Sequence, residues 1–188
     1  EEVWRLNCGA DNFDYTDPEG NWWVMDEAFT SVFRWGFFNG NINFSTRPIS
    51  GATNEVFNNH RWGGTDLSYR IEVPNGQYKV KLMFAETFWT GPGQRIYDVA
   101  LNGLTVLTDH DIYAEKGRDT ADEHTFFVTV TDQAIDVTFP RIVADQALIS
   151  GIEIKPTHIT DDEFLGFLQK KMFFYFLNET NPATGLIK

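Results

Sequence analysis

The chain has 188 residues and only one cysteine, Cys8. A single thiol excludes any disulfide within the chain, so the fold must depend on a hydrophobic core, and Cys8 is expected to be a small buried side chain. A chain of this length can bury a sizeable core without covalent cross-links. We therefore expect one globular domain, with room for a fragment of a second.

Positive charge and long apolar runs are also scarce. Lys and Arg number 15 against 27 Asp and Glu, which gives a formal net charge of −12 at pH 7. That charge repels phosphate backbones and anionic bilayers, so nucleic acid and lipid surfaces are not expected as partners. No apolar stretch approaches the roughly 18 residues that span a bilayer, so membrane insertion is not expected either. The chain opens without a basic and apolar leader, and its N-terminus therefore predicts no compartment.

The middle of the chain alternates apolar and polar residues in short segments, which is typical of half-buried strands. Asn102-Gly103 is a favoured two-residue hairpin turn, and Pro74-Asn75-Gly76 is a second turn. Strands are expected at 69–73, 77–86, 96–101, 104–107, 125–131, 135–139 and 148–154. Short strands with turns every eight to twelve residues predict an all-β, antiparallel, jelly-roll-like β-sandwich. The first sixty residues are looser, and we expect one or two strands there, with long loops.

The last thirty residues have a helical pattern. Thr160-Asp161-Asp162-Glu163 is a capping box, and Asn181-Pro182 would end the helix that it starts. Ten of the fourteen residues in 164–177 are apolar and cover most of the helix circumference, whereas a surface helix needs only a stripe. We expect this helix to be the first of a larger helical domain. The alternative is a terminal strap that docks on the sheet.

The adjacent aromatics Phe88 and Trp89 lie where the strand predicted at 77–86 leaves the sheet. Alternate residues of that strand, from Tyr78 to Phe84, would face the core, but two neighbouring rings cannot both do so. Aromatic faces at a loop tip suit the C–H groups of a sugar ring. The alternative is that the two rings cap the open end of the sandwich core.

Several motifs point to one family. The most specific are Phe84-Ala85-Glu86 followed by two aromatics, Gln94-Arg95-Ile96-Tyr97-Asp98-Val99 and Leu101-Asn102-Gly103. Supporting matches are Asn7-Cys8-Gly9, Asn58-Asn59-His60-Arg61-Trp62, Leu107-Thr108-Asp109-His110-Asp111-Ile112 and Gly151-Ile152-Glu153-Ile154. Together these motifs resemble the malectin fold (carbohydrate-binding module family 57) over about 3–155.

The resemblance implies a β-sandwich that binds glucose-containing oligosaccharides through loop aromatics and one carboxylate. By position, the paired loop aromatics of the family correspond to Phe88 and Trp89, the aromatic after an arginine to Trp62, and the acid to Asp145. The family also uses a tyrosine followed by glycine, for which Trp35-Gly36 is the nearest match here. Because Trp62 stands where malectin has tyrosine, a hydroxyl donor is lost and the sugar preference can differ.

The C-terminal segment has its own likeness. Met172-Phe173-Phe174-Tyr175-Phe176, followed by Asn181-Pro182-Ala183-Thr184-Gly185-Leu186, resembles the start of bacterial glucoamylase-like domains, which are (α/α) barrels of glycoside hydrolases. The two likenesses together imply a carbohydrate-binding sandwich at 1–155, a linker at 156–160 and the first helix of a truncated (α/α) barrel domain at 161–188. The implied partner in cis is the C-terminal catalytic domain.

The chain itself is not expected to be an enzyme. It has no nucleophile elbow, P-loop or dinucleotide fingerprint. Glycosidases use two nearby carboxylates, and Glu86, Asp98 and Asp145 could approach one another. We expect instead that Glu86 and Asp98 pair with Arg95 or accept hydrogen bonds from loop amides.

No cofactor and no metal site are expected. The four histidines show no metal-ligand spacing: His60, His110, His124 and His158. Asp109-His110-Asp111 looks like a ligand triplet, but such a triplet more simply ends a strand with its side chains bonded to their own turn. An acidic loop of Asp11, Asp14, Asp17 and Glu19 leaves a structural calcium as the alternative, although its irregular spacing and Pro18 exclude an EF-hand.

Two functions remain open at this point. The first is a non-catalytic carbohydrate-binding module, appended to a glycoside hydrolase, that holds a glucan near the catalytic domain. The second is a structural spacer of the same fold that packs on the catalytic domain and binds no sugar. The direction in which Trp62, Phe88, Trp89 and Asp145 point separates the two. The resemblance also implies a secreted bacterial protein, periplasmic or extracellular.

Overall fold

The computed structural model describes residues 3–157 of the chain. The chain divides after Pro156 into the units Glu1–Pro156 and Thr157–Lys188. The helix predicted at 161–188 and most of the linker predicted at 156–160 lie outside the described residues. Within the described part, no helix is long and apolar enough to cross a membrane.

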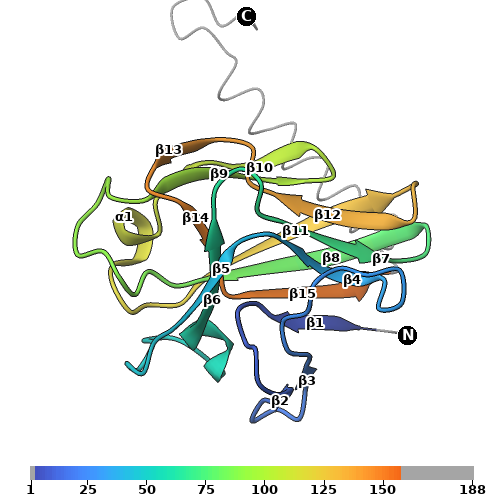
Figure 1. Ribbon diagram of the computed structural model, residues 1–188, viewed down its shortest axis with the longest axis horizontal. Coiled ribbons are helices and arrows are strands. Elements are labelled where there is room, and N and C mark those ends of the chain that lie inside the picture. The colour runs from blue at the N-terminus through green and yellow to red at the C-terminus, as the bar shows by residue number, and fades with distance from the viewer. Residues whose placement is uncertain (1–2, 158–188) are drawn as a thin grey trace, which may run out of the picture. The chain divides into compact units, whose positions relative to one another are not determined.

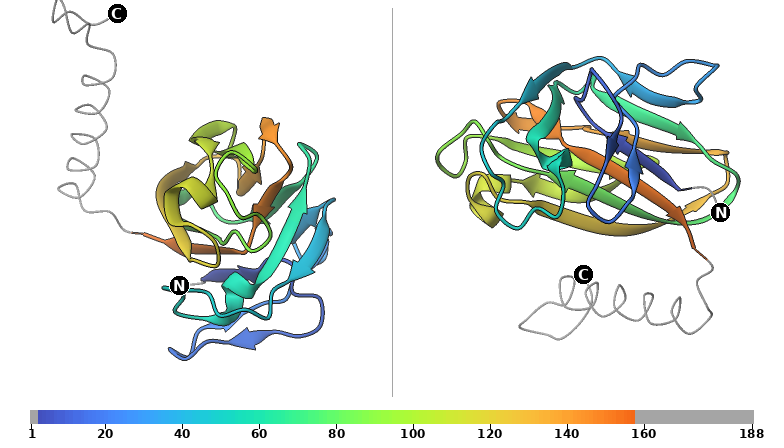
Figure 2. Two further views of the ribbon diagram at one scale, coloured as in Figure 1. Left: turned by 90° about the vertical axis from the view of Figure 1, so that its left-hand side faces the viewer. Right: turned by 90° about the horizontal axis from the view of Figure 1, so that it is seen from below.

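Two larger sheets form the body of the first unit (Figure 1). The four-stranded sheet has the order β1 (Trp4–Asn7), β15 (Gly151–Pro156), β8 (Gly76–Phe84) and β11 (Asp122–Val130). The six-stranded sheet has the order β10 (Leu104–His110), β9 (Ile96–Leu101), β12 (Ala134–Thr138), β7 (Ser68–Glu72) and β4 (Trp35–Phe38), with β13 (Ile142–Ala144) paired to β9. All strand pairs in both sheets are antiparallel. Figures 1 and 2 show the two sheets as layers whose strands run in broadly the same direction.

Two smaller sheets close the sandwich. One has the order β14 (Ala147–Ile149), β6 (Asn59–Gly63) and β5 (Asn41–Phe44), and the other pairs β2 (Tyr15–Thr16) with β3 (Trp22–Trp23). Short helices are a 3-10 turn at Glu55–Asn58 and α1 at Ile112–Lys116. In Figure 1, β6 crosses β8 and β15 steeply, and the loop from β8 to β9 extends beyond it. The small sheet and this loop therefore meet at one end of the sandwich.

The core lies between the two large sheets. The fully buried side chains of the four-stranded sheet include Leu6, Val80, Leu82, Phe84, Ile152 and Ile154, and those of the other sheet include Tyr69, Ile71, Tyr97, Val99, Ile135 and Val137. Burial of one such aliphatic or aromatic side chain stabilises the fold by about 1.5–3 kcal/mol. A second cluster around Trp23, Val56, Phe57 and Met83 covers the outer face of β8 near its end. The end of β8, where the β8–β9 loop begins, is therefore buried on both faces.

The structure confirms the all-β antiparallel sandwich, and each strand predicted after residue 68 has a counterpart. Asn102 and Gly103 have φ values of 47° and 78°, as a type I′ hairpin turn requires. Cys8 is buried, as expected. The last predicted strand is instead two, β14 and β15, because the chain passes from one sheet to another at Ser150.

The expectation of one or two strands in the first sixty residues was wrong, since β1 to β5 all lie there. These strands have two to four residues each, too few for a period of two to stand out. β5 is exposed along its whole length and therefore has no apolar face to detect.

Candidate carbohydrate site

The β8–β9 loop carries the paired aromatics out of the sheet. Glu86 and Thr87 are still buried, whereas Phe88 is 62% exposed and Trp89 is half-buried. The two rings meet edge to face, with centroids 4.9 Å apart. Among the described residues, neither ring belongs to the core clusters or to the side chains packed against them. The two aromatics therefore present ring surface at the end of the sandwich.

A buried ion pair fixes the start of this loop. Glu86 Oε1 accepts hydrogen bonds from the backbone amides of Phe88 at 2.8 Å and Trp89 at 3.0 Å. Its Oε2 accepts from Arg95 Nε at 2.7 Å, and the two side chains are 1% and 8% exposed. A buried carboxylate is tolerated only when its oxygens are satisfied in this way. This confirms the expectation that Glu86 pairs with Arg95 and accepts from loop amides, and it places Phe88 and Trp89 by their backbone.

Asp145 lies beside the aromatic pair, between β13 and β14. Its Oδ2 accepts from Trp89 Nε1 at 2.8 Å and lies 3.0 Å from Arg95 Nη1. The same guanidinium group donates to the carbonyl of Gln146 at 2.6 Å. The Asp145 side chain remains 33% exposed. The structure thus brings Phe88, Trp89 and Asp145 together around Arg95, although 56 residues separate Trp89 from Asp145.

His60 supports the loop from below. Its Nε2 lies 3.0 Å from Thr87 Oγ1 and its Nδ1 lies 2.9 Å from Ser150 Oγ, so the ring bridges β6, the loop and the β14–β15 connection. Burial, with a smaller contribution from the charge of Arg95, lowers the pKa of His60 to about 4. His60 is therefore neutral at pH 7 and can accept at one nitrogen while it donates at the other.

Trp62 lies two residues after His60 on β6. Alternate residues of a strand share a face, so Trp62 projects from the same face of the small sheet as His60, which contacts the loop at Thr87. Trp62 pairs with Leu148 of β14, three residues after Asp145, and with Asn41 of β5. The candidate Trp62 is half-buried and, unlike Phe88 and Trp89, packs against the hydrophobic core.

Two polar side chains on this face were missed by sequence reasoning. Asn41 pairs with Trp62 and Asn43 pairs with His60, and cross-strand partners point to the same face. Both asparagines are exposed, and each amide carries donors and an acceptor that suit sugar hydroxyls. The alternation Asn-Ile-Asn-Phe over 41–44 indicates that the two asparagines share one face of a strand. Without the register of β5, however, it does not show which residues lie beside them.

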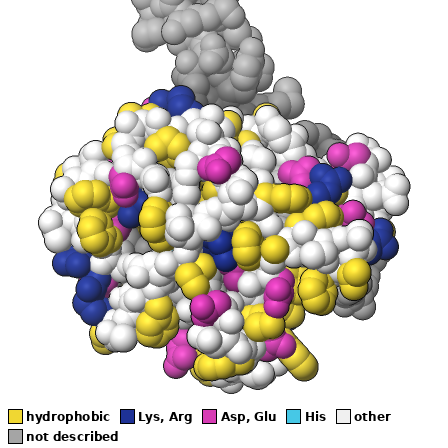
Figure 3. All heavy atoms as spheres, in the orientation of Figure 1, with side chains coloured by type: hydrophobic (Ala, Val, Ile, Leu, Met, Phe, Trp, Pro, Cys, Tyr) yellow, Lys and Arg dark blue, Asp and Glu magenta, His cyan; other side chains and the backbone are white. Residues whose placement is uncertain are grey.

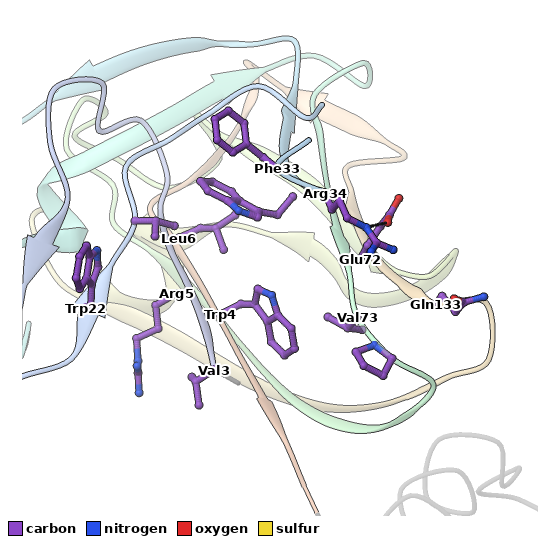
Figure 4. A pocket seen from close by; sticks show the side chains of 13 residues that line it. Val3, Trp4, Arg5, Leu6, Trp22, Phe33, Arg34, Glu72, Val73 and Gln133 are labelled. Atoms are coloured by element: carbon purple, nitrogen blue, oxygen red, sulfur yellow. Dashed lines mark hydrogen bonds and ion pairs between the residues drawn. The ribbon is translucent and has the colours of Figure 1, made fainter. Parts of the chain in front are cut away.

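Trp35 lies elsewhere. It belongs to β4 and lines a groove of about 750 Å³, which none of the other four candidates lines. Figure 4 shows Trp4 in the middle of this groove, with Trp22 and Phe33 on two sides and Arg34 next to Glu72. Arg34 Nε and Glu72 Oε2 are 2.6 Å apart. This groove is therefore distinct from the surface of Phe88, Trp89 and Asp145.

The three carboxylates that could have formed a glycosidase pair are all engaged with arginine. Asp98 accepts two hydrogen bonds from Arg141, at 2.8 and 2.9 Å, and one from the amide of Asp109. The hydrogen bonds from Arg141 hold the pKa of Asp98 below its ordinary value. A general acid of a glycosidase needs a raised pKa instead. Asp98 thus pairs with Arg141 and not with Arg95, and the amide that it accepts from belongs to Asp109 of β10 and not to a loop.

The N-terminal acidic loop uses its carboxylates internally. Asp17 accepts hydrogen bonds from the indole of Trp23 at 3.0 Å and from the Asn21 backbone amide at 2.8 Å. Asp14 accepts from the amide of Met25 at 2.9 Å. These contacts connect β2 and β3 and give the acidic residues a role in the loop itself.

The surface in Figure 3 has scattered groups of hydrophobic side chains between polar ones. One such group lies at the left-hand end, over the β8–β9 loop, next to acidic and basic side chains. An aromatic surface with a few fixed polar groups at its edge is the usual composition of a small-molecule site.

Comparison with known proteins gives a consistent result. The family model of the malectin domain matches residues 2–156. Malectin-A of Xenopus laevis is 24% identical over 139 residues, which are 72% of this chain and 48% of that protein. The chain thus spans about half the length of the malectins that it matches.

Two solved structures share the fold. A beta-glucuronidase of Bacteroides uniformis has a TM-score of 0.75 at 20% identity, over 84% of this chain and 18% of that one. The ANX2 ectodomain of Arabidopsis thaliana has a TM-score of 0.60 at 19% identity, over 80% of this chain and 48% of that one. At such identities the likeness is one of fold. With the family model matching nearly all described residues, the chain belongs to the malectin domain family.

Proposed function

We propose that this unit is a non-catalytic carbohydrate-binding module that binds glucose-containing oligosaccharides or polysaccharides at the β8–β9 loop. The observation that carries the proposal is the hydrogen bond from Trp89 Nε1 to Asp145, beside the exposed ring of Phe88. It fixes an aromatic face and a carboxylate edge next to each other. A pyranose ring can then stack on the aromatic face while its hydroxyls donate to the carboxylate.

Other contacts favour a site made before the ligand arrives. The Glu86–Arg95 pair and the His60 bridge fix the loop backbone, so little conformational entropy remains to be lost on binding. Trp62, Asn41 and Asn43 extend the surface along the small sheet and would contact further sugar units. A neutral glycan is indifferent to the net charge of −12.

We further propose that the module serves a glycoside hydrolase in cis and acts outside the cytoplasm, in the periplasm or beyond the cell. The similar domain in the Bacteroides uniformis beta-glucuronidase is one precedent for this sandwich within a glycosidase. The apolar segment 164–177, with its likeness to glucoamylase-like domains, is the second support. Holding a glucan near the catalytic domain raises its effective concentration there.

The second candidate function is a structural spacer that binds no sugar. The groove of Trp4, Trp22, Phe33 and Trp35 favours it, because an aromatic-lined concavity is also a surface on which a neighbouring domain can pack. In that case the loop aromatics would be incidental to function.

Calorimetric titration of the chain with gluco-oligosaccharides of several linkages and both anomers separates these functions. We expect saturable binding to one linkage class, abolished in Trp89→Ala without a loss of thermal stability. Trp22→Ala, which removes an exposed groove tryptophan, is the matched control and should bind as the wild type does. No heat with any sugar from a folded chain would favour the spacer. A large loss of stability in Trp89→Ala would instead show that the ring caps the core.

A further inference from the structure

A cluster of two imidazoles and two carboxylates lies behind the candidate sugar site. His110 ends β10, Glu115 lies on α1, and Asp122 and His124 begin β11. One ligand atom from each of the four lies within 4.8 Å of the others. Sequence spacing gave no sign of this cluster, because β10 and β11 belong to different sheets and only the fold brings His110 to His124.

Two of the separations match those between ligands of one metal ion. His110 Nε2 lies 3.3 Å from Asp122 Oδ2, and His124 Nε2 lies 3.1 Å from the same oxygen. Zn²⁺ bound at 2.0–2.1 Å with tetrahedral geometry places its ligand atoms about 3.3 Å apart. Glu115 closes the solvent side, with Oε2 3.9 Å from His124 Nε2 and Oε1 3.2 Å from His110 Nδ1. A small inward shift of the exposed Glu115 side chain would supply the fourth ligand of the ion.

Two polar atoms in the cluster are buried without a hydrogen bond among the described residues: His110 Nε2 and Asp122 Oδ1. Asp122 Oδ1 also lies 3.1 Å from His124 Nε2, but in that pair only Oδ2 has hydrogen-bond geometry. Both side chains are 0% exposed. Leaving a buried polar atom unpaired is costly, and a cation would satisfy both atoms at once.

The imidazole of His110 is also held in place. Phe84 and Tyr97 contact it edge-on, with centroids 5.0 and 5.4 Å away, and His124 meets it at 89° and 5.2 Å. Because Nδ1 faces Glu115, Nε2 of the same ring is directed toward Asp122.

We propose that His110, Asp122 and His124, with Glu115 from the exposed side, bind a divalent transition metal of the Zn²⁺ class. Two imidazoles favour such an ion over Ca²⁺ or Mg²⁺, which take oxygen ligands, and the absence of thiolate disfavours Cu(I). Four protein ligands make the site structural, since a catalytic zinc keeps a position open.

The site would stabilise the β10–β11 connection, and that connection supports the sugar loop. Asp111, next to His110, accepts a hydrogen bond from the amide of Gly93 at 2.5 Å. Farther along, Arg118 donates to the carbonyl of Thr87 at 3.1 Å, and the amide of Asp119 donates to the carbonyl of Glu86 at 2.8 Å. Metal binding is therefore expected to order both segments.

The experiment uses the chain without a histidine tag, stripped of metal with a chelator. Zn²⁺ is titrated by calorimetry, Co²⁺ is added to record its visible spectrum, and thermal unfolding is followed with and without Zn²⁺. We expect one equivalent of Zn²⁺, the intense absorption of tetrahedral Co²⁺, and a midpoint that rises with Zn²⁺ concentration because the ion binds the folded state. Weak binding of Mg²⁺ and Ca²⁺ is expected in the same assay.

Variants assign the ligands. His124→Gln should abolish saturable Zn²⁺ binding, and Glu115→Gln should weaken it about 10- to 100-fold. Glu123→Gln is the matched control, because Glu123 neighbours both ligands on β11 but is exposed and pairs with Lys81. The half-exposed positions of His124 and Glu115 make folded variants attainable, and circular dichroism of each variant verifies this.

Either of two results would overturn the metal site: no binding of Zn²⁺ or Co²⁺ to a folded, stripped chain, or binding that His124→Gln leaves unchanged. The cluster would then be a hydrogen-bonded pair of histidines on a shared aspartate. The Zn²⁺ titration contains no sugar, so its outcome is independent of the proposed carbohydrate binding. Conversely, Trp89→Ala should lose sugar binding and retain Zn²⁺ binding.

Discussion

Two aromatic surfaces in residues 3–157 differ in what lies behind the rings. In the groove, Trp4 and Trp35 pack against the hydrophobic core, and Trp4 meets Tyr78 edge-on. At the β8–β9 loop, Phe88 and Trp89 stay clear of the core clusters and are held by the buried Glu86–Arg95 pair. Burying an ion pair such as Glu86–Arg95 has a desolvation penalty, whereas packing Trp4 and Trp35 on the core stabilises the fold, which is reason enough for those rings to be there. The loop is therefore the better candidate for a binding surface, although the groove has a volume of about 750 Å³.

The charges at the two surfaces sharpen this contrast. Beside the groove, Arg34 pairs with Glu72 at a largely exposed position, and exposed pairs of that kind contribute little. Arg5 pairs with Glu153 at a mostly buried position. At the loop, Asp145 is held by Arg95 and Trp89 yet keeps part of its carboxylate in solvent, where a hydroxyl group can reach it.

The largest expected effect comes from the buried arginine of the loop. Arg95→Met leaves the Glu86 carboxylate buried without its cation and releases Asp145, so we expect a loss of about 3–5 kcal/mol in the free energy of unfolding. Sugar binding should be lost as well, because the loop backbone is no longer fixed. Urea denaturation of both proteins measures the first effect and calorimetry the second.

A double variant tests the cause. Arg95→Met combined with Glu86→Gln removes the uncompensated charge and should recover part of the stability. Glu86→Gln is also measured alone. If it lowers the free energy of unfolding by the same amount with and without Arg95→Met, the two effects are additive and the two side chains do not act as a pair.

The second effect is a pH dependence at the base of the loop. The pKa of His60 is lowered to about 4 by burial and by Arg95, whereas an unfolded histidine titrates near 6.5. Between these values the unfolded chain binds a proton that the folded chain does not, so stability is complete above pH 6.5 and falls as the pH drops toward 4. The loss should reach about 3 kcal/mol at the lower end.

Denaturant unfolding at several pH values measures this slope. His60→Gln is expected to be less stable at pH 7 but to lose less stability between pH 6.5 and pH 5. The carboxylate of Glu153, whose pKa is lowered from 4.5, adds its own acid loss only below that window. An unchanged slope in His60→Gln would assign the acid sensitivity to other groups.

The third effect divides the contribution of Trp89 between its ring and its N–H group. Trp89→Phe keeps an aromatic face but removes the hydrogen bond to Asp145, so we expect a loss of about 1–2 kcal/mol in sugar affinity, against complete loss in Trp89→Ala. Calorimetry with the preferred sugar makes the comparison. Equal losses in both variants would mean that orientation of Asp145 matters more than ring stacking.

The fold could be predicted from the sequence because β7, β8, β11 and β12 bury alternate residues over most of their length and therefore show a period of two. The aromatic pair could be predicted because neighbouring rings cannot share one face of a strand. Glu86 as an internal ion-pair partner was likewise expected from its closeness to Arg95 in the sequence.

Long-range pairings escaped prediction for a physical reason. β5 and β6 are joined by a long connection over 45–58 that does not fix their register, so Asn41 and Asn43 could not be placed beside Trp62. The meeting of His110 with His124 requires the packing of two sheets, which spacing along the chain does not encode. Trp35 was chosen by the likeness Trp35-Gly36 in a stretch of different length, and in the structure it lines the groove instead.

The smallest expected effect is the one that decides between the two surfaces. Trp22 is 63% exposed on β3 and contributes one wall of the groove. Because its ring packs little against the core, Trp22→Ala should change the free energy of unfolding by less than about 0.5 kcal/mol. If the loop is the sugar site, Trp22→Ala should also bind sugar with the affinity of the wild type in calorimetry. If Trp22→Ala binds no sugar while Trp89→Ala still does, the groove is the site, and core-packed aromatics rather than a polar-anchored loop select the ligand.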